Sequence, residues 1–193
     1  MANTVTTGSG QAATEQAHQA KLQQSILQPD TPAPEFSLRS TPDQWVSLSE
    51  FRGRPVILLF YPEDWSPVCT DELALFNEVL PTFEEYDAQL FGISVDSAWC
   101  HLAFSDHRNL RFPLLADFHP KAEVAMKYGV YREQDGVAAR ALFLIDGEGT
   151  IRWSYLSPLG VSPGANRVLR ALQKLYPEAG AVTSDKGQGT SDA

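Results

Sequence analysis

The fold is decided by one stretch, Val56-Ile57-Leu58-Leu59-Phe60-Tyr61-Pro62-Glu63-Asp64-Trp65-Ser66-Pro67-Val68-Cys69-Thr70-Asp71-Glu72. Its first five residues are all apolar, which predicts a central strand buried on both faces. From Thr70 to about Val79 the pattern predicts a helix. Cys69 therefore lies where a buried strand gives way to a helix. The unpaired backbone N–H groups and the dipole of a helix start favour a thiolate over a thiol, so the sequence predicts a reactive cysteine.

Strands and helices alternate on both sides of this stretch. Before it, we expect one short strand ending at Leu38 and another over Trp45–Leu48, followed by a turn that ends at Gly53. After it, the patterns predict a strand over 90–95, a helix over 98–107, an edge-like strand with a proline over 112–117, a helix over 121–128 closed by Gly129, a hairpin of strands 141–145 and 151–155, and an amphipathic helix over 165–175. The order β-α-β-α-β-β-α predicts an α/β protein of the thioredoxin-like fold, in which helices flank a central mixed β-sheet. The early strands and the helix from Ala98 are additions to that core.

The chain divides into one folded domain and two tails. Residues 1–28 are rich in Ala, Gln, Thr and Gly, and the apolar stripe of a helix over Ala12–Leu27 would be thin, so a flexible tail or loosely docked arm is expected. Residues 29–176 are predicted to form the thioredoxin-like domain. Residues 177–193 read as a disordered tail.

Composition narrows the classes of partner. A net charge of -9 and a sequence pI near 4.8 argue against nucleic acid and anionic membranes. No apolar run reaches the ~18 residues of a membrane span, and the start of the chain lacks the pattern of a secretory signal. The two cysteines make no disulfide framework, which predicts a cytoplasmic protein whose thiols are reduced at rest. No Cys/His spacing resembles a metal site, and no cofactor is expected.

A nucleophilic Cys69 needs a cation nearby and donors that stabilise charge on the leaving atom. The Ser66 hydroxyl is short enough to reach the sulfur or a bound oxygen, and Pro62 can shield the sulfur from water. The cation is expected to be Arg140, which stands just before a strand that should neighbour the strand of the motif. Glu72, one turn into the helix, is expected to hold that guanidinium. Trp65 either lines the entrance or packs under the loop.

The spacing Pro62-x-x-x-Ser66-x-x-Cys69 resembles the active-site signature of the peroxiredoxins, in which a proline, a threonine or serine and the peroxidatic cysteine are so placed. The resemblance extends over about Pro32 to Leu175 and is carried by further segments, namely Ser47–Pro55, Cys69–Glu72, Tyr128–Val130 and Arg140–Arg152. Among peroxiredoxins, the chain looks most like the bacterioferritin-comigratory-protein and AhpE-like subgroup. Ser66 departs from the commoner threonine but keeps the hydroxyl.

This resemblance implies an antioxidant thiol peroxidase without a cofactor. The Cys69 thiolate would attack the O–O bond of hydrogen peroxide or an organic hydroperoxide and become a sulfenic acid. Ser66, Arg140 and the backbone N–H of Cys69 would orient the peroxide, Pro62 would shield the sulfur, and Glu72 would hold Arg140. The Gly-Gly-Leu-Gly and Tyr-Phe elements of easily over-oxidised members are absent, which implies resistance to sulfinic acid formation.

Cys100 decides the expected recycling route. Some peroxiredoxins resolve their sulfenic acid with a cysteine in this helix, which implies a Cys69–Cys100 disulfide reduced by thioredoxin or a similar dithiol protein. Because a disulfide needs Cα atoms within ~7 Å, this step is expected to require local unfolding. The alternative is a one-cysteine peroxiredoxin recycled by an external thiol, with Cys100 as a small apolar residue.

Two further alternatives concern the type of protein. A thiol–disulfide oxidoreductase would need Cys-x-x-Cys at the helix start, where this chain has Ser66 and Cys69, so we reject it. A redox sensor or chaperone-like protein on the same fold stays open and would stop after one equivalent of peroxide. A homodimer is preferred to a monomer because many members of the family pair through the loops around this site.

Overall fold

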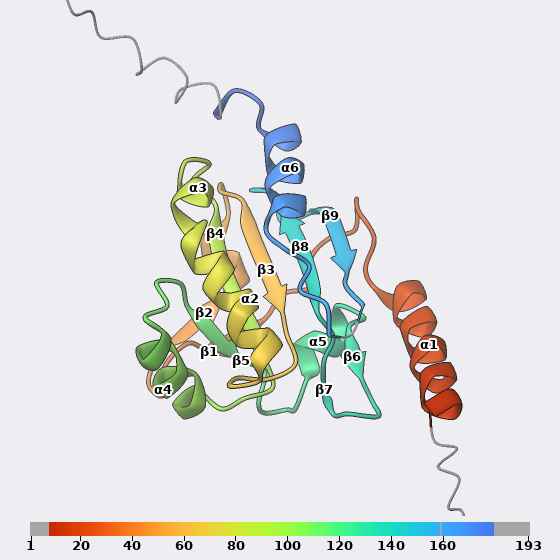
Figure 1. Ribbon diagram of the computed structural model, residues 1–193. Coiled ribbons are helices and arrows are strands. Elements are labelled where there is room, and N and C mark those ends of the chain that lie inside the picture. The colour runs from red at the N-terminus through yellow and green to blue at the C-terminus, as the bar shows by residue number, and fades with distance from the viewer. Residues whose placement is uncertain (1–7, 159, 180–193) are drawn as a thin grey trace, which may run out of the picture.

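The computed structural model describes residues 8–158 and 160–179 of the chain (Figure 1). A seven-stranded mixed sheet lies at its centre, with the strand order β2-β1-β5-β4-β3-β8-β9. These strands are β1 (Ser37–Arg39), β2 (Trp45–Ser47), β3 (Val56–Phe60), β4 (Gln89–Ser94), β5 (Leu114–Ala116), β8 (Ala141–Ile145) and β9 (Ile151–Leu156). A separate two-stranded hairpin joins β6 (Tyr131–Arg132) to β7 (Val137–Ala138).

Helices cover both faces of the sheet. They are α1 (Gly8–Ser25), the 3₁₀ helix η1 (Leu48–Phe51), α2 (Pro67–Glu78), α3 (Leu80–Glu84), α4 (Ala98–Arg108), α5 (Glu123–Lys127) and α6 (Asn166–Leu175). Side chains alternate across a strand, so Ile57 and Leu59 of β3 face one core, and Leu58 and Phe60 face the other. The first core includes residues of α2, α4 and α6, and Figure 1 shows α2 and α6 in front of the sheet. The second core includes residues of α1 and α5.

The predicted fold class is confirmed. β3 is buried along its whole length, pairs in parallel with β4 through the crossover that contains α2, and pairs antiparallel with β8. β8 and β9 form the predicted antiparallel hairpin. The result is a mixed sheet flanked by helices, with β1 and β2 added at one edge, as a thioredoxin-like fold with N-terminal additions requires.

The expectation of an edge-like strand over 112–117 is wrong. β5 lies inside the sheet, parallel to β4 and antiparallel to β1. Pro113 stands one residue before the strand, and its carbonyl accepts a hydrogen bond from Gly92 N–H at 3.1 Å. A proline at this position contributes an acceptor to the ladder, so its missing N–H does not force the strand to the edge.

Helix α2 begins at Pro67, three residues before its predicted start at Thr70. Ser66 is the N-cap residue and Pro67 occupies the first turn, where a missing N–H costs no helical hydrogen bond. Cys69 therefore belongs to the first turn of α2. The β6–β7 hairpin was not predicted, because strands of two residues are too short to show alternation.

Within the segment predicted to be a tail or arm, the structure describes helix α1. Its buried Leu22 lies in the core beside Ile26, just after the helix. Gly129 has a φ of 71°, and a Cβ there would lie 1.9 Å from the carbonyl oxygen of Ser25, so the last residue of α1 lies directly against the glycine that follows α5. Of the two predicted tails, residues 1–7 and 180–193 lie outside the described residues.

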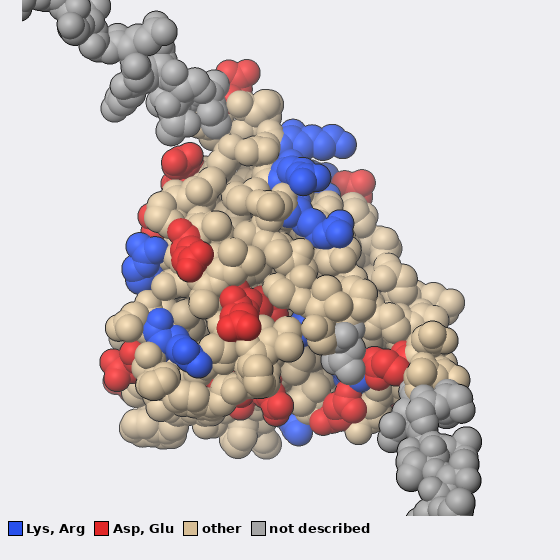
Figure 2. Space-filling model, in the orientation of Figure 1, with Lys and Arg blue, Asp and Glu red and all other residues tan. Residues whose placement is uncertain are grey.

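Charge is unevenly distributed on the face drawn in Figure 2. Basic side chains gather over α6, which contains Arg167, Arg170 and Lys174, while acidic side chains are spread across the rest of that face. In Figure 1, α6 lies toward the opposite end of the sheet from the start of α2.

In the part of the chain that the structure describes, no helix combines the length and apolar character needed to cross a membrane.

Candidate active site

Cys69 lies in the first turn of α2 with its side chain fully buried. Its backbone N–H donates to the Ser66 hydroxyl at 3.4 Å, so Ser66 caps the helix. The side chain belongs to the core that also contains Leu73 and Phe76 of α2. The sulfur is thus held in an apolar setting at a helix N-terminus, where the helix dipole favours negative charge.

Arg140 stands just before β8, whereas Cys69 lies in the helix that follows β3. The pairing of these two strands brings Arg140 to the sulfur. Phe60, the last residue of β3, stands opposite Ala141, the first residue of β8. In an antiparallel pair, the residue before β8 must therefore lie beside the start of the loop after β3. Arg140 Nη2 donates to Cys69 Sγ at 3.2 Å, and Arg140 is almost completely buried. A buried guanidinium in contact with the sulfur stabilises negative charge on it.

Glu72 binds the same guanidinium. Its Oε2 accepts from Arg140 Nη1, and both side chains are buried. Burial raises the pKa of Glu72 to about 7, although the charge and hydrogen bond of Arg140 act in the lowering direction. One guanidinium thus contacts both Glu72 and Cys69. The contacts match the arrangement expected from the sequence, while the functional role of each residue stays a prediction.

Several polar atoms around the sulfur have no protein partner. Arg140 Nε, Glu72 Oε1 and Thr70 Oγ1 are buried without a hydrogen bond. Buried polar groups without partners are rare because each loses its hydration, and they often occur where a ligand binds. Arg140 therefore has a spare N–H donor beside the sulfur that it contacts.

Pro62 and Trp65 lie in the loop between β3 and α2. Pro62 is half-buried, directly after Tyr61. Trp65 is 48% exposed, has a φ of 62°, and packs against α4, with its ring 5.0 Å from Phe104 and 5.4 Å from His107 between centroids. Trp65 therefore packs against α4, and its predicted position at the entrance or under the loop stays a prediction.

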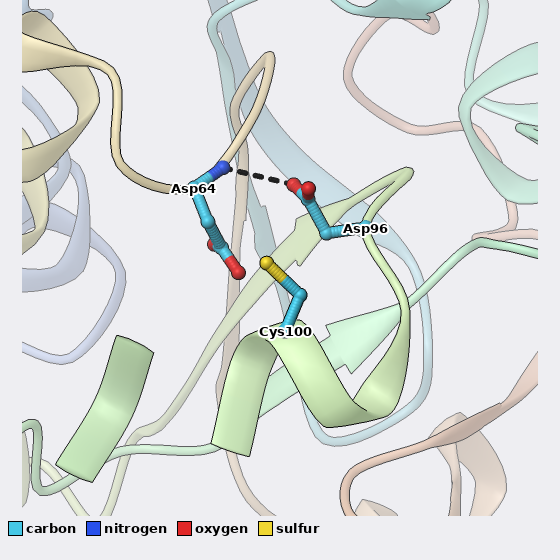
Figure 3. Close-up of side chains that lie close together, drawn as sticks. All are labelled: Asp64, Asp96 and Cys100. Carbon is cyan, nitrogen blue, oxygen red and sulfur yellow. Dashed lines mark hydrogen bonds between the residues drawn. The ribbon is translucent and has the colours of Figure 1, made fainter. Parts of the chain in front are cut away.

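Cys100 lies in the first turn of α4, whose N-cap is Ser97. Both cysteines are free. Figure 3 shows the Cys100 sulfur directed toward Asp64 and Asp96, and the three side chains place their ligand-type atoms within 4.8 Å of one another. Burial raises the pKa of the Cys100 thiol to about 11, and the Asp64 and Asp96 charges also act to raise it.

Hydrogen bonds within the protein account for this acidic cluster. Asp96 Oδ2 accepts from Asp64 N–H at 2.8 Å, drawn as the dashed line in Figure 3, and from the Ser94 hydroxyl at 2.6 Å. Asp64 accepts from the Tyr61 hydroxyl at 2.7 Å and lies 2.8 Å from His101 Nδ1.

Sequence reasoning assigned no role to Tyr61, Asp64 or His101. All three side chains are buried and hydrogen-bonded to one another beside the two cysteines. The available signal was position. Tyr61 and Asp64 lie within the motif stretch, and His101 adjoins Cys100 in the sequence.

A mixed sheet with a buried cysteine at a helix start, contacted by an arginine, defines a thiol enzyme of the thioredoxin-like class. Residues 29–154 match the model of the AhpC/TSA family. The chain is 36% identical over 152 residues to peroxiredoxin-2 of Bos taurus, covering 74% of this chain and 75% of that protein. It is 37% identical over 129 residues to alkyl hydroperoxide reductase E of Mycobacterium bovis, covering 66% of this chain and 84% of that protein.

Solved structures agree with these sequence relationships. The reduced 2-Cys peroxiredoxin of Plasmodium vivax superposes with a TM-score of 0.71 at 28% identity, covering 78% of this chain and 98% of that one. Peroxidoxin BcpB of Mycobacterium tuberculosis gives a TM-score of 0.71 at 27% identity, covering 77% and 98%. The chain belongs to the AhpC/TSA family and is a peroxiredoxin, an oxidoreductase that acts on peroxide.

Proposed function

We propose that this peroxiredoxin reduces hydrogen peroxide and organic hydroperoxides through Cys69, and that Cys100 resolves the oxidised enzyme within the same chain. The observation that carries the first part is the contact of Arg140 Nη2 with Cys69 Sγ at 3.2 Å, together with the unpaired Arg140 Nε. One guanidinium thus stabilises the nucleophile and offers a donor to a substrate oxygen.

In the peroxidatic step, the Cys69 thiolate attacks one peroxide oxygen, an S–O bond forms, and the O–O bond breaks. The second oxygen leaves with the bonding electron pair, takes up a proton and departs as water or an alcohol. Cys69 is left as a sulfenic acid, oxidised by two electrons. Arg140 is placed to stabilise the charge that grows on the leaving oxygen, and Glu72 keeps the guanidinium oriented.

In the resolving step, the Cys100 sulfur attacks the sulfur of the Cys69 sulfenic acid. The S–O bond breaks, a disulfide forms, and the hydroxide that leaves combines with the thiol proton as water. Both thiols are free in the structure, Cys69 in contact with Arg140 and Cys100 near Asp64 and Asp96. For their sulfurs to bond, the two cysteines must leave these surroundings, and this is the local unfolding predicted from the sequence. A dithiol protein of the thioredoxin type then reduces the disulfide and completes the cycle.

Peroxide turnover tests both parts. Wild type, Cys69→Ser and Cys100→Ser are supplied with thioredoxin, its reductase and NADPH, and NADPH consumption is followed with hydrogen peroxide or cumene hydroperoxide. Sustained turnover by wild type, none by Cys69→Ser and one equivalent by Cys100→Ser are expected. Full turnover by Cys100→Ser with a monothiol would favour the one-cysteine alternative. A wild type that stops after one equivalent would instead indicate the redox sensor.

Disulfide mapping identifies the intermediate. After one equivalent of peroxide, mass spectrometry without reduction should find a peptide pair that joins Cys69 to Cys100. Sulfenic acid or a mixed disulfide at Cys69 as the sole product would argue against Cys100.

A homodimer and a cytoplasmic location complete the proposal. Trp65 in the loop and Trp99 and Leu102 of α4 expose large apolar side chains close to the site, and Trp99 is 71% exposed. A second copy that covers these side chains would remove apolar area from water. Light scattering during gel filtration measures the dimer, and Trp99→Glu is expected to weaken it.

The cytoplasmic location is proposed because two free thiols suit a reducing compartment.

A further inference from the structure

A buried hydrogen-bonded contact between a carboxylate and an imidazole joins the two segments that carry the cysteines. Asp64 lies in the loop that leads to Cys69, and His101 is the neighbour of Cys100 in α4. Asp64 Oδ2 lies 2.8 Å from His101 Nδ1, and the two side chains are 0% and 1% exposed. The contact spans 37 positions of the chain. Any movement that separates the loop from α4 must break it.

Further contacts strengthen the same junction. The other Asp64 oxygen accepts from the Tyr61 hydroxyl at 2.7 Å, and Asp64 N–H donates to Asp96. Trp65 packs on Phe104 and His107, with its backbone in the left-handed region, which is strained for a residue with a side chain. Opening the loop would release that strain, whereas the hydrogen bonds of Asp64 favour the closed loop.

We infer that the Asp64–His101 pair is a catch that holds the loop of Cys69 against α4 and thereby limits the rate of disulfide formation. The inference rests on the proposed resolution of Cys69 by Cys100. While the catch is closed, Cys69 keeps its contact with Arg140, and Cys100 stays beside the Asp64 carboxylate. When it opens, the sulfenic acid of Cys69 can approach the Cys100 thiol, and disulfide and water form as described above.

The catch has a chemical consequence, because a second reaction is open to the Cys69 sulfenic acid while the loop is closed. It can react with another peroxide to give a sulfinic acid, which the Cys100 thiol does not reverse. A tighter catch therefore favours sulfinic acid, and a weaker catch favours the disulfide. Asp64 and His101 are positioning residues in this scheme, since neither contacts the reacting sulfur of Cys69.

The test measures the ratio of disulfide to sulfinic acid at Cys69 over a series of hydrogen peroxide concentrations, by acid quench and mass spectrometry. Asp64→Asn removes the carboxylate and His101→Leu removes the imidazole, so each leaves a buried polar group poorly satisfied, and the ratio should rise by about tenfold or more. His101→Asn keeps a donor near the position of Nδ1 and should return the ratio toward wild type. Asp106→Asn, an exposed carboxylate on the same helix, is the matched control and should leave it unchanged.

Tyr61→Phe keeps the test decisive should Asp64→Asn or His101→Leu fail to fold. It removes one hydroxyl without changing the ring, and it should raise the ratio by about two- to fivefold, as the loss of one hydrogen bond implies. In each of these three variants, the rate constant of reduced Cys69 with peroxide should fall, because the open loop separates the sulfur from Arg140.

The outcomes separate this inference from the proposed function. A wild type that forms no Cys69–Cys100 disulfide would overturn the resolving role itself. A wild type that forms the disulfide, with ratios in the folded Asp64, His101 and Tyr61 variants equal to those of Asp106→Asn, would overturn the catch alone.

Discussion

The guanidinium of Arg140 lies 3.2 Å from the sulfur of Cys69, although 71 positions separate the two residues. The antiparallel register of β3 and β8 creates this contact, since it sets Arg140 beside the loop that leads into α2. Glu72, from the same helix as Cys69, binds another nitrogen of the guanidinium. Cys69, Arg140 and Glu72 are thus held together by two adjacent strands and the helix that follows one of them.

Replacing Arg140 tests this arrangement. Arg140→Gln should lower the rate constant of Cys69 with hydrogen peroxide by about 10²–10³, the loss usual for a preorganised donor to a developing oxyanion. Arg140→Lys keeps the charge but cannot contact Cys69 and Glu72 with two nitrogens at once, so it should recover only part of the rate.

Stopped-flow kinetics of the reduced enzyme measure these rate constants. Arg108→Lys, an exposed arginine on α4, is the control and should react like wild type. Equal rates for Arg140→Gln and Arg108→Lys would remove Arg140 from the mechanism.

Glu72 should make stability depend on pH. Its pKa in the folded protein is about 7, above the value of 4.5 for an unperturbed glutamate. Between these values the folded state binds more protons than the unfolded state, so the free energy of unfolding falls as pH rises from about 4.5 to 7. The fall should approach about 3 kcal/mol, at 1.36 kcal/mol for each pKa unit.

Comparison with Glu72→Gln isolates this contribution, since the glutamine does not titrate. Urea unfolding of both proteins at pH 5 and pH 7.5 should show that wild type loses more stability than the variant over this interval. Parallel losses in the two proteins would mean that Glu72 has an ordinary pKa when folded.

Ser66 should contribute through the helix cap. Its hydroxyl accepts from Cys69 N–H, so Ser66→Ala should lower the free energy of unfolding by about 1 kcal/mol, while Ser66→Thr keeps the acceptor and should cost only a few tenths. Thermal unfolding measures both. The peroxide rate of Ser66→Thr should stay near wild type, and a large loss would show that the missing methyl of serine matters.

The sequence alone was sufficient to predict the strand before Cys69 and the residues that contact it, while the predicted helix began three residues too late. A fully apolar run and the arginine before a neighbouring strand are local signals, and antiparallel pairing converts the second of these into a contact. The capping role of Ser66 was missed, which is why the predicted helix began late. The predicted position of β5 was wrong, because a proline suggested an edge strand. Pro113 stands just outside the strand and contributes only its carbonyl, as an acceptor, to the sheet.

The buried network of Tyr61, Asp64 and His101 could not be predicted in this way. An aspartate in a loop and a histidine in a helix are usually solvated, and no periodic pattern distinguishes the buried ones. Their pairing depends on how α4 docks against the loop after β3, which is a property of tertiary packing. The docking of α1 was hard to predict for a similar reason, because most of its side chains whose burial the structure describes are exposed.

Cys100 should be a slow nucleophile in the closed protein. Its pKa is raised from 9.0 to about 11, chiefly by burial, so at pH 8 its thiolate is about a hundredfold scarcer than that of an ordinary cysteine. Iodoacetamide should therefore modify Cys100 of a Cys69→Ser variant about a hundredfold more slowly in buffer than in urea. Equal rates in the two solvents would show that the thiol is already exposed and unperturbed.

Arg132 should anchor helix α1 to the domain through Glu15. The carboxylate of Glu15 accepts two hydrogen bonds from the guanidinium, at 2.9 and 3.0 Å, and the Arg132 side chain is 2% exposed. Glu15→Ala leaves this buried cation with Asp135 as its remaining acidic partner among the described residues, so the free energy of unfolding should fall by about 1–3 kcal/mol. Lys21→Ala removes the exposed ion pair of the same helix with Glu133 and should cost about 0.5 kcal/mol or less. Urea unfolding of both variants decides the matter, since equal losses would mean that α1 is held by its apolar contacts at Leu22 and Ile26.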